Sequence, residues 1–176
     1  MPILSEPHST SSFRKGLLPK ILISVFVIML LGGLSGWITS SGIDSWYTTL
    51  NKPFFQPPNW LFGPAWTTLY ILMGISFARI WQVVVKSRYP IIRIFAQRGL
   101  VIFGIHFLFN LAWTPIFFGL ESPEWALFVI LVLLAFIIIL IFHFFRIDRI
   151  AAFLLIPYAV WVTFATILNA SIVYLN

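Results

Sequence analysis

The chain has 176 residues, of which 60% are hydrophobic and 9% are charged. Soluble domains carry roughly 25% charged residues, so this composition excludes an ordinary water-soluble fold and indicates a protein that lies in a lipid bilayer. The absence of cysteine excludes disulfides, iron–sulfur clusters and thiolate metal sites. The net charge is +6, but the basic residues separate hydrophobic runs. We therefore expect membrane topology to explain them and expect no nucleic-acid partner.

Five stretches lack Asp, Glu, Lys and Arg, and each is long enough to cross a bilayer core of ~30 Å as a helix. They are Ile21–Ile43, Pro53–Ala78, Gly99–Leu120, Trp125–Phe145 and Ile150–Asn176. We therefore predict an all-α, integral membrane bundle of five transmembrane helices over residues 17–176. The second helix should become regular at Pro64, because proline suits the first helical turn, and run to about Val85. The Ser-rich segment 1–16 is expected to be a disordered N-terminal tail.

The loops between these stretches alternate in charge. Nine lysines and arginines fall on one side of the predicted membrane, whereas Lys52 is the one basic residue on the other side. Because positively charged loops stay inside, this asymmetry predicts that the N-terminus lies inside and the C-terminus outside. Arg79 is the one charge expected within a helix. It could belong to an ion pathway, but we favour a side chain that extends to the nearby inner interface.

The longest connection runs from Thr39 to Gly63 and is rich in prolines near its end. Prolines fix φ and remove backbone donors, so we expect an ordered, non-helical segment, which could cover a site as a lid. Its aromatic residues are equally typical of the belt at a membrane interface, and both interpretations stay open. These aromatic residues are Trp46, Tyr47 and Trp60.

Helix geometry places several aromatic and polar residues at one depth, beneath this connection. At a rise of 1.5 Å per residue, Trp66 and Tyr70 lie ~3 Å and ~9 Å below the outer end of the second helix. Asn110 and Trp161 lie ~17 Å and ~18 Å above the inner ends of the third and fifth helices. Lipid offers an amide no partner, so Asn110 and Asn169 should point into the bundle, either as interhelical contacts or as part of a pocket. The same helix faces continue through Trp113, Thr114 and Ala165.

Four further residues within the predicted helices have specific roles to consider. Pro115 should bend the third helix and open space near the pocket. Gly32 and Gly36 allow a close helix approach, either inside the bundle or at a dimer contact. His106 could ligate haem iron, but a hydrogen-bonding core residue is the more common role. All five acidic residues lie outside the charge-free stretches and no metal-ligand cluster occurs within them, so we expect no metal site and little scope for acid–base chemistry.

Three motifs resemble those of one membrane protein family. The first is Trp46-Tyr47-x-x-Leu50-x-Lys52-Pro53-x-x-x-Pro57-Pro58-x-Trp60-x-Phe62-Gly63-Pro64-x-Trp66-Thr67-x-Leu69-Tyr70-x-Leu72-Met73-Gly74. The others are Asn110-Leu-Ala-Trp113-Thr114-Pro115-Ile-Phe-Phe-Gly119 and Pro157-Tyr158-x-x-Trp161-Val162-x-Phe164-Ala165-Thr166-x-Leu168-Asn169. Together they strongly resemble the TspO/MBR family, which includes the tryptophan-rich sensory proteins and the mitochondrial translocator protein (peripheral benzodiazepine receptor). The resemblance covers the chain after its N-terminal tail.

The resemblance implies a homodimer of five-helix subunits, with a pocket under the first connection that binds tetrapyrroles such as protoporphyrin IX or haem as ligands. It implies no required cofactor. Some members also bind sterols and benzodiazepine-type ligands. Carried over by position, the pocket residues are Tyr47, Pro57, Trp66, Asn110, Trp113, Thr114, Trp161 and Ala165, and depth adds Tyr70 to this set. Trp66 and Trp161 also resemble the family residues linked to light-dependent porphyrin breakdown, and are the candidate catalytic pair.

One departure from the family's sequence pattern argues against sterol binding. The sterol motif of the animal proteins needs a basic residue after a tyrosine near the end of the fifth helix. Here Tyr174 is followed by Leu175 and Asn176. The leading hypothesis is a membrane sensor or transporter of porphyrins. The rivals are a light-dependent protoporphyrin IX-degrading enzyme and a scaffold with an incidental pocket. The charge bias fits a bacterial cell membrane, and the family's alternative location is the mitochondrial outer membrane.

Overall fold

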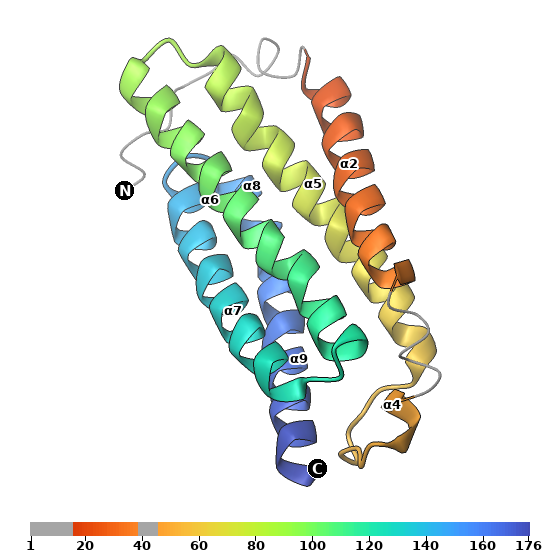
Figure 1. The fold of residues 1–176 in the computed structure, drawn as a ribbon. Coiled ribbons are helices and arrows are strands. Elements are labelled where there is room, and N and C mark those ends of the chain that lie inside the picture. The colour runs from red at the N-terminus through yellow and green to blue at the C-terminus, as the bar shows by residue number, and fades with distance from the viewer. Residues whose placement is uncertain (1–15, 39–45) are drawn as a thin grey trace.

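A computed structural model describes residues 16–38 and 46–176, which form a bundle of helices (Figure 1). In chain order the elements are α2 (Leu17–Ile38), α4 (Trp46–Thr49), the 3₁₀ turn η1 (Asn59–Leu61), α5 (Phe62–Lys86), α6 (Pro90–Thr114), the π-helical turn η2 (Pro115–Gly119), α7 (Pro123–Phe145), α8 (Arg149–Phe153) and α9 (Ile156–Leu175). Across these residues, five helical segments are long and apolar enough to cross a membrane, which confirms the predicted fold class. Apart from Gly16, the predicted tail lies outside the described residues, as does the predicted end of the first helix at Ile43.

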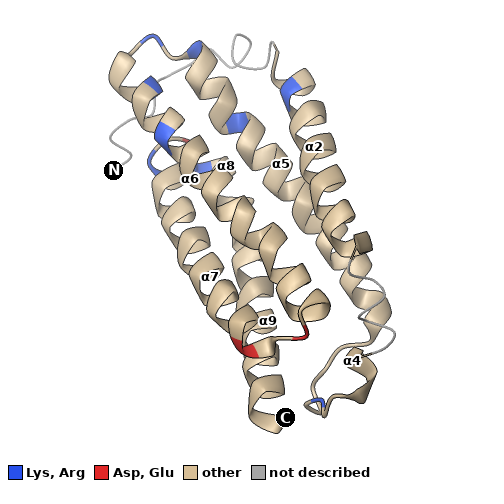
Figure 2. Ribbon diagram, viewed as in Figure 1, with Lys and Arg blue, Asp and Glu red and all other residues tan. Residues whose placement is uncertain are grey.

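The helices pack as a sequence of antiparallel neighbours. Helix α2 lies along α5, α6 contacts both α5 and α7, and α9 packs behind on α7 (Figure 1). The end that carries α4 and the last turn of α9 is here named the loop end. The opposite end is named the basic end, because it carries the charged residues of the α5–α6 and α7–α8 connections (Figure 2). The basic residues of these two connections are Lys86, Arg88, Arg146 and Arg149.

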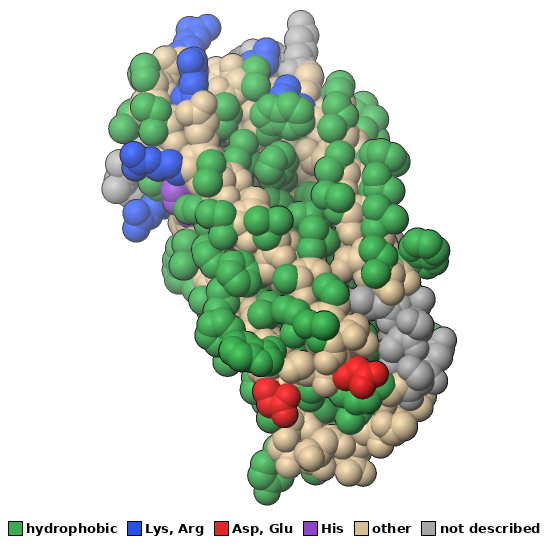
Figure 3. Space-filling view, in the orientation of Figure 1, with side chains coloured by type: hydrophobic (Ala, Val, Ile, Leu, Met, Phe, Trp, Pro, Cys, Tyr) green, Lys and Arg blue, Asp and Glu red, His purple; other side chains and the backbone are tan. Residues whose placement is uncertain are grey.

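The flank of the bundle is strongly apolar. Hydrophobic side chains cover the middle of the visible face, between basic residues at one end and acidic residues at the other (Figure 3). Large side chains such as Phe26 and Phe142 are exposed over 66% and 68% of their surface. In water such a surface would be an aggregation hazard, whereas in a bilayer it matches the solvent. The exposed flank is therefore the lipid-facing surface.

Buried side chains form two hydrophobic clusters inside the bundle. The larger one joins Met73 and Ile80 of α5 to Tyr158 of α9, and all three side chains are fully buried. Helix α7 adds a layer to this cluster with Leu133, Ile137 and Leu140. The smaller cluster lies at the loop end, where aromatic side chains predominate among the residues packed around it. Its buried members are Tyr47, Phe117, Ala126, Leu168 and Ile172.

Prolines decide where two of the long helices break. Pro115 has no N–H to donate to the carbonyl of Leu111, and that carbonyl instead accepts a hydrogen bond of 3.0 Å from the hydroxyl of Ser35 on α2. The chain then continues as the π-helical turn η2, with Leu120 N donating to Pro115 O at 2.9 Å. The bend predicted at Pro115 is therefore a change of helix type at the loop end.

The fifth span is divided into α8 and α9, which the sequence pattern did not predict. Pro157 cannot donate to the carbonyl of Phe153, and α8 ends at that residue. Leu155 N donates a hydrogen bond to Ala152 O at 3.0 Å. The carbonyl of Ala151 accepts a hydrogen bond of 2.8 Å from the hydroxyl of Ser76 on α5. The break therefore ties the fifth span to α5 through a side chain.

Arg79 does not simply extend to the interface. Its guanidinium makes an ion pair with Asp148, with Nη2 2.8 Å and Nε 2.9 Å from Oδ2. The other carboxylate oxygen, Oδ1, accepts from the backbone N–H groups of Ile150 and Ala151 and caps the start of α8. The structural role of this charge is to join α5 to the α7–α8 connection at the basic end.

Other predicted boundaries shift for local reasons. Helix α5 begins at Phe62, two residues before Pro64. Helix α6 begins at Pro90, earlier than the predicted stretch from Gly99, because the first turns of α6 carry charged residues and so lie outside the charge-free stretch. The long connection was expected to be non-helical, but it contains α4 and η1. Among the described residues of this connection, the expectation is correct for the proline-rich part between these two short elements.

Candidate functional site

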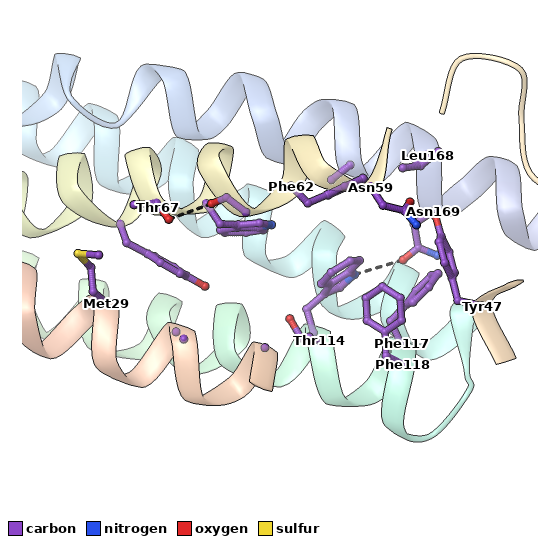
Figure 4. A pocket seen from close by; sticks show the side chains of 18 of the residues that line it. Met29, Tyr47, Asn59, Phe62, Thr67, Thr114, Phe117, Phe118, Leu168 and Asn169 are labelled. Carbon is purple, nitrogen blue, oxygen red and sulfur yellow. Dashed lines mark hydrogen bonds between the residues drawn. The ribbon is translucent and has the colours of Figure 1, made fainter. Parts of the chain in front are cut away.

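A cavity of about 450 Å³ lies in the half of the bundle nearer the loop end. Its size falls within the range of roughly 300–1,000 Å³ that is typical of small-molecule sites. Residues from α2, α4, η1, α5, α6, η2 and α9 line it, so no single helix forms the site. Figure 4 shows Phe117 and Phe118 beside Tyr47 at one end of the cavity and Met29 at the other.

Helix α5 supplies one aromatic wall. Trp66 and Tyr70 lie one turn apart on the same face, with ring centroids 5.4 Å apart. Trp66 also meets the buried ring of Tyr158 from α9, with centroids 6.3 Å apart. This wall presents an indole and a phenol to the cavity.

The end of α6 and the turn η2 supply a second aromatic wall. The ring of Trp113 stacks on that of Phe117, with centroids 5.3 Å apart and an interplanar angle of 25°. The Trp113 indole N–H donates to Asn169 Oδ1 at 3.2 Å, and Asn169 Nδ2 donates to the carbonyl of Pro123 at 2.8 Å. Both polar ends of Asn169 are therefore used to hold the indole ring in place. The indole ring of Trp113 is therefore held in one orientation at this wall.

Residues of α4 close the loop end of the cavity. Tyr47 is only 5% exposed and meets Phe117 and Phe118 edge to face, with centroids 5.9 Å and 5.3 Å away. Burial raises the pKa of the Tyr47 hydroxyl, so the group remains neutral at physiological pH. Lys52 Nζ lies 4.6 Å from the centroid of the same ring. We name residues 46–52 the lid, because Tyr47 closes this end of the cavity.

The lid is also tied to the end of α9. Asn51 N donates to Asn176 Oδ1 at 2.9 Å, and Asn176 Nδ2 donates back to Asn51 O at 3.1 Å. Asn51 Nδ2 adds a bond of 3.3 Å to the carbonyl of Leu175. We name the pair Asn51 and Asn176 the asparagine clasp.

Helix α9 lines the cavity with Ala165, Leu168, Asn169 and Ile172, and helix α2 lines it mainly with glycines. A Cβ added at Gly32 would collide with the ring of Tyr70, so glycine is required for this close approach. Gly33 also lines the cavity, and a Cβ added there would meet no described atom within 4 Å. Of the two glycines predicted to allow a close helix approach, Gly32 therefore does so inside the bundle, where it admits Tyr70, and Gly36 lines the cavity.

A buried polar chain leads from the cavity into the bundle. The hydroxyl of Tyr70 lies 3.5 Å from Asn110 Oδ1, and Asn110 Nδ2 lies 2.8 Å from the hydroxyl of Tyr158. That hydroxyl is 3.1 Å from His106 Nε2, while His106 Nδ1 is 3.1 Å from the carbonyl of Phe103. Both nitrogens of His106 are occupied within the core. The hydrogen-bonding role considered for His106 fits this geometry, and haem ligation does not.

Six of the nine predicted site residues line the cavity. They are Tyr47, Trp66, Tyr70, Trp113, Thr114 and Ala165. Asn110 lies behind Tyr70, and Pro57 is not among the lining residues. Trp161 packs between Phe62 and Phe164, with both ring centroids 5.8 Å away, and its buried Nε1 has no hydrogen-bond partner among the described residues.

The cavity also includes residues that the sequence did not suggest. Met29 and Gly33 belong to α2, and Phe118 belongs to η2. The i, i+4 spacing of Met29 and Gly33 was a usable signal that these residues share a face. No comparable signal existed for Phe118, because its direction depends on the π-helical turn.

The fold and the cavity define a class of protein: a multi-pass membrane protein of five helices, with an aromatic cavity under its first connection. The sequence profile of the TspO/MBR family matches residues 24–175, and the chain belongs to this family. The predicted family is confirmed.

Three relatives illustrate the family's range. The chain is 39% identical to the tryptophan-rich protein TspO of Chlorobaculum tepidum, over 82% of this chain and 88% of the relative. It is 37% identical to the tryptophan-rich sensory protein of Cereibacter sphaeroides, over 76% and 78%. It is 34% identical to the human translocator protein, over 70% of each chain. These names are those of membrane sensor and translocator proteins.

Proposed function

We propose that this protein binds porphyrins in its cavity and acts as a membrane sensor or transporter for them. The observation that carries the proposal is the cavity of about 450 Å³ with tryptophans on two of its walls. Protoporphyrin IX and haem are the ligands that we expect. Sterols remain a weaker expectation, and the predicted homodimer remains a prediction.

The chemistry of the walls suits a flat tetrapyrrole. Trp66 and Trp113 present aromatic faces from different helices, and such faces stack on a conjugated ring. Gly33 leaves space on the facing wall. Lys52 supplies a positive charge at the loop end, which favours a ligand with carboxylate groups near that end.

Titration of the detergent-purified protein with protoporphyrin IX tests the proposal. We expect saturable quenching of tryptophan fluorescence, because Trp66 and Trp113 line the cavity. Gly33→Leu should fill the cavity and weaken binding roughly tenfold or more. Gly104→Leu is the matched control, because Gly104 is also an exposed helical glycine whose added Cβ meets no described atom within 4 Å. Absence of saturable binding, or an equal effect of both variants, would contradict the proposal.

An enzyme that degrades protoporphyrin IX in light is the second candidate. The indole of Trp66 lines the cavity, where it could exchange an electron with an excited porphyrin. Product analysis after illumination separates the two functions. Many turnovers of a new tetrapyrrole product favour the enzyme, and unchanged porphyrin favours the sensor or transporter.

A further inference from the structure

In the polar chain behind the cavity, the group at one end fixes which member donates and which accepts in each hydrogen bond. Its last member is the carbonyl of Phe103, which can only accept a hydrogen bond. His106 Nδ1 must therefore carry a proton and donate it. None of the hydrogen-bond or ring partners that the structure gives His106 among the described residues is acidic, so nothing there compensates an imidazolium charge. The neutral ring with its proton on Nδ1 leaves Nε2 as an acceptor.

The direction then passes from group to group. Because His106 Nε2 accepts, the hydroxyl of Tyr158 donates to it. The oxygen of Tyr158 is then free to accept from Asn110 Nδ2, which matches their distance of 2.8 Å. Asn110 Oδ1 is left as the acceptor for the hydroxyl of Tyr70. The contacts of 2.8–3.1 Å from Asn110 to Phe103 set this direction, and they leave Asn110 Oδ1 facing the hydroxyl of Tyr70 at 3.5 Å.

The opposite direction fails at the histidine. If the Asn110 amide were reversed, Tyr158 would donate to Asn110, and His106 Nε2 would have to donate to Tyr158. A neutral His106 would then place an unprotonated Nδ1 against the carbonyl of Phe103, which is a contact between two acceptors. The helix carbonyl therefore sets the direction of the whole chain.

We propose that Tyr70 acts as a hydrogen-bond acceptor toward the ligand and determines which chemical group occupies the inner end of the cavity. Its only hydroxyl proton is directed at Asn110, so its oxygen offers lone pairs to the cavity that it lines. This inner end selects an O–H or N–H donor and disfavours a carbonyl or carboxylate oxygen. The inference rests on the proposed function, since it concerns the same cavity. It places the propionates of a porphyrin toward the loop end.

The first test needs no ligand. Nitrogen-15 NMR of histidine-labelled protein should show His106 with a protonated Nδ1 and an unprotonated Nε2. Its signals are assigned by their loss in His106→Leu, or by removal of His8 and His143 where that variant does not fold. A proton on Nε2, alone or on both nitrogens, overturns the inference whatever the protein binds.

The second test uses two porphyrins of nearly equal shape. Hematoporphyrin carries hydroxyethyl groups, which can donate, in place of the vinyl groups of protoporphyrin IX. Diacetyldeuteroporphyrin carries acetyl groups there, which only accept. We expect the wild type to prefer hematoporphyrin by roughly tenfold. Tyr70→Phe should remove this preference, because it deletes the acceptor and keeps the ring.

A variant of His106 tests the relay itself. In His106→Leu the hydroxyl of Tyr158 loses its acceptor and can donate to Asn110, which frees the proton of Tyr70 for the cavity. The preference for hematoporphyrin should then shrink, although His106 does not line the cavity. If His106 only supported the structure, His106→Leu would weaken the binding of both porphyrins equally. Equal affinity of the wild type for the two porphyrins overturns the role of Tyr70, whereas binding of neither contradicts the proposed function as well.

Discussion

Single residues of one type have different roles in this protein, as its tryptophans show. Trp66 lines the cavity, whereas Trp161 packs between Phe62 and Phe164 outside it. Trp125 is 68% exposed on α7. The three positions therefore represent a cavity wall, a packing contact and an exposed surface of the bundle.

Phenylalanine substitutions should separate these roles. Trp66→Phe should weaken protoporphyrin IX binding by roughly 1 kcal/mol through lost stacking, and should reduce any light-dependent porphyrin loss further, because indole is easier to oxidise than a phenyl ring. Trp161→Phe should mainly lower the melting temperature. Trp125→Phe serves as the control. Melting temperature, porphyrin affinity and photoproduct yield are measured on all three variants, and identical behaviour of Trp66→Phe and Trp125→Phe would contradict the assignment of this wall.

The ion pair at the basic end should matter for stability. Arg79→Ala leaves the carboxylate of Asp148 without its charged partner in a largely buried place, and we expect a loss of roughly 3 kcal/mol. Asp148→Asn should cost less, because an amide can still cap α8. Arg98→Ala, at an exposed position of α6, is the control. Thermal unfolding in detergent measures the effect, and a melting temperature equal to that of Arg98→Ala would show that the pair contributes little.

At the scale of elements, the long helices supply most of the cavity lining, and a proline-induced turn and the lid complete it at the loop end. Pro115 ends the regular part of α6 and starts η2, which carries Phe117 and Phe118 to the cavity. The lid brings Tyr47 against the same two rings. The aromatic contact and the asparagine clasp therefore hold the lid against the rest of the bundle at the loop end.

The asparagine clasp should slow the release of ligand. Asn176→Ala removes both bonds between its side chain and the backbone of Asn51. We expect porphyrin dissociation to become severalfold faster, with a smaller change in the association rate, because the clasp holds the closed lid. Stopped-flow fluorescence measures both rates. Ser171→Ala, which removes a hydroxyl bond within α9, is the control, and equal dissociation rates in the two variants would contradict the lid.

At the scale of the whole molecule, the two ends differ in charge. In the described residues the basic end carries most lysines and arginines, and Glu121 and Glu124 lie at the loop end (Figure 2). This asymmetry supports an orientation with the basic end inside. The cavity would then open toward the outer side of the membrane.

Reporter fusions test that orientation. Fusions at residue 120 and after residue 176 should both report an outside location, and a fusion at residue 88 should report an inside location. The reason is that short basic loops resist translocation. A cytoplasmic signal at either of the first two sites would reverse the orientation, although the fold and the cavity would stand.

The amino-acid sequence by itself determined the number of membrane-spanning segments, their approximate bounds, the family and six of the residues that line the cavity. These features depend on local composition and on helical spacing, which a linear pattern records. Depth along a helix follows from residue number, so Trp66, Tyr70 and Trp113 could be placed together.

Only the tertiary structure decided how each helix is rotated and which side chains meet. It packed Trp161 against Phe62 and Phe164 rather than in the cavity lining, brought the glycines of α2 to the cavity and paired Arg79 with Asp148. It also joined Tyr70 to His106 through the side chains of Asn110 and Tyr158. Such contacts depend on packing between segments that are distant in sequence, and no single helix specifies them.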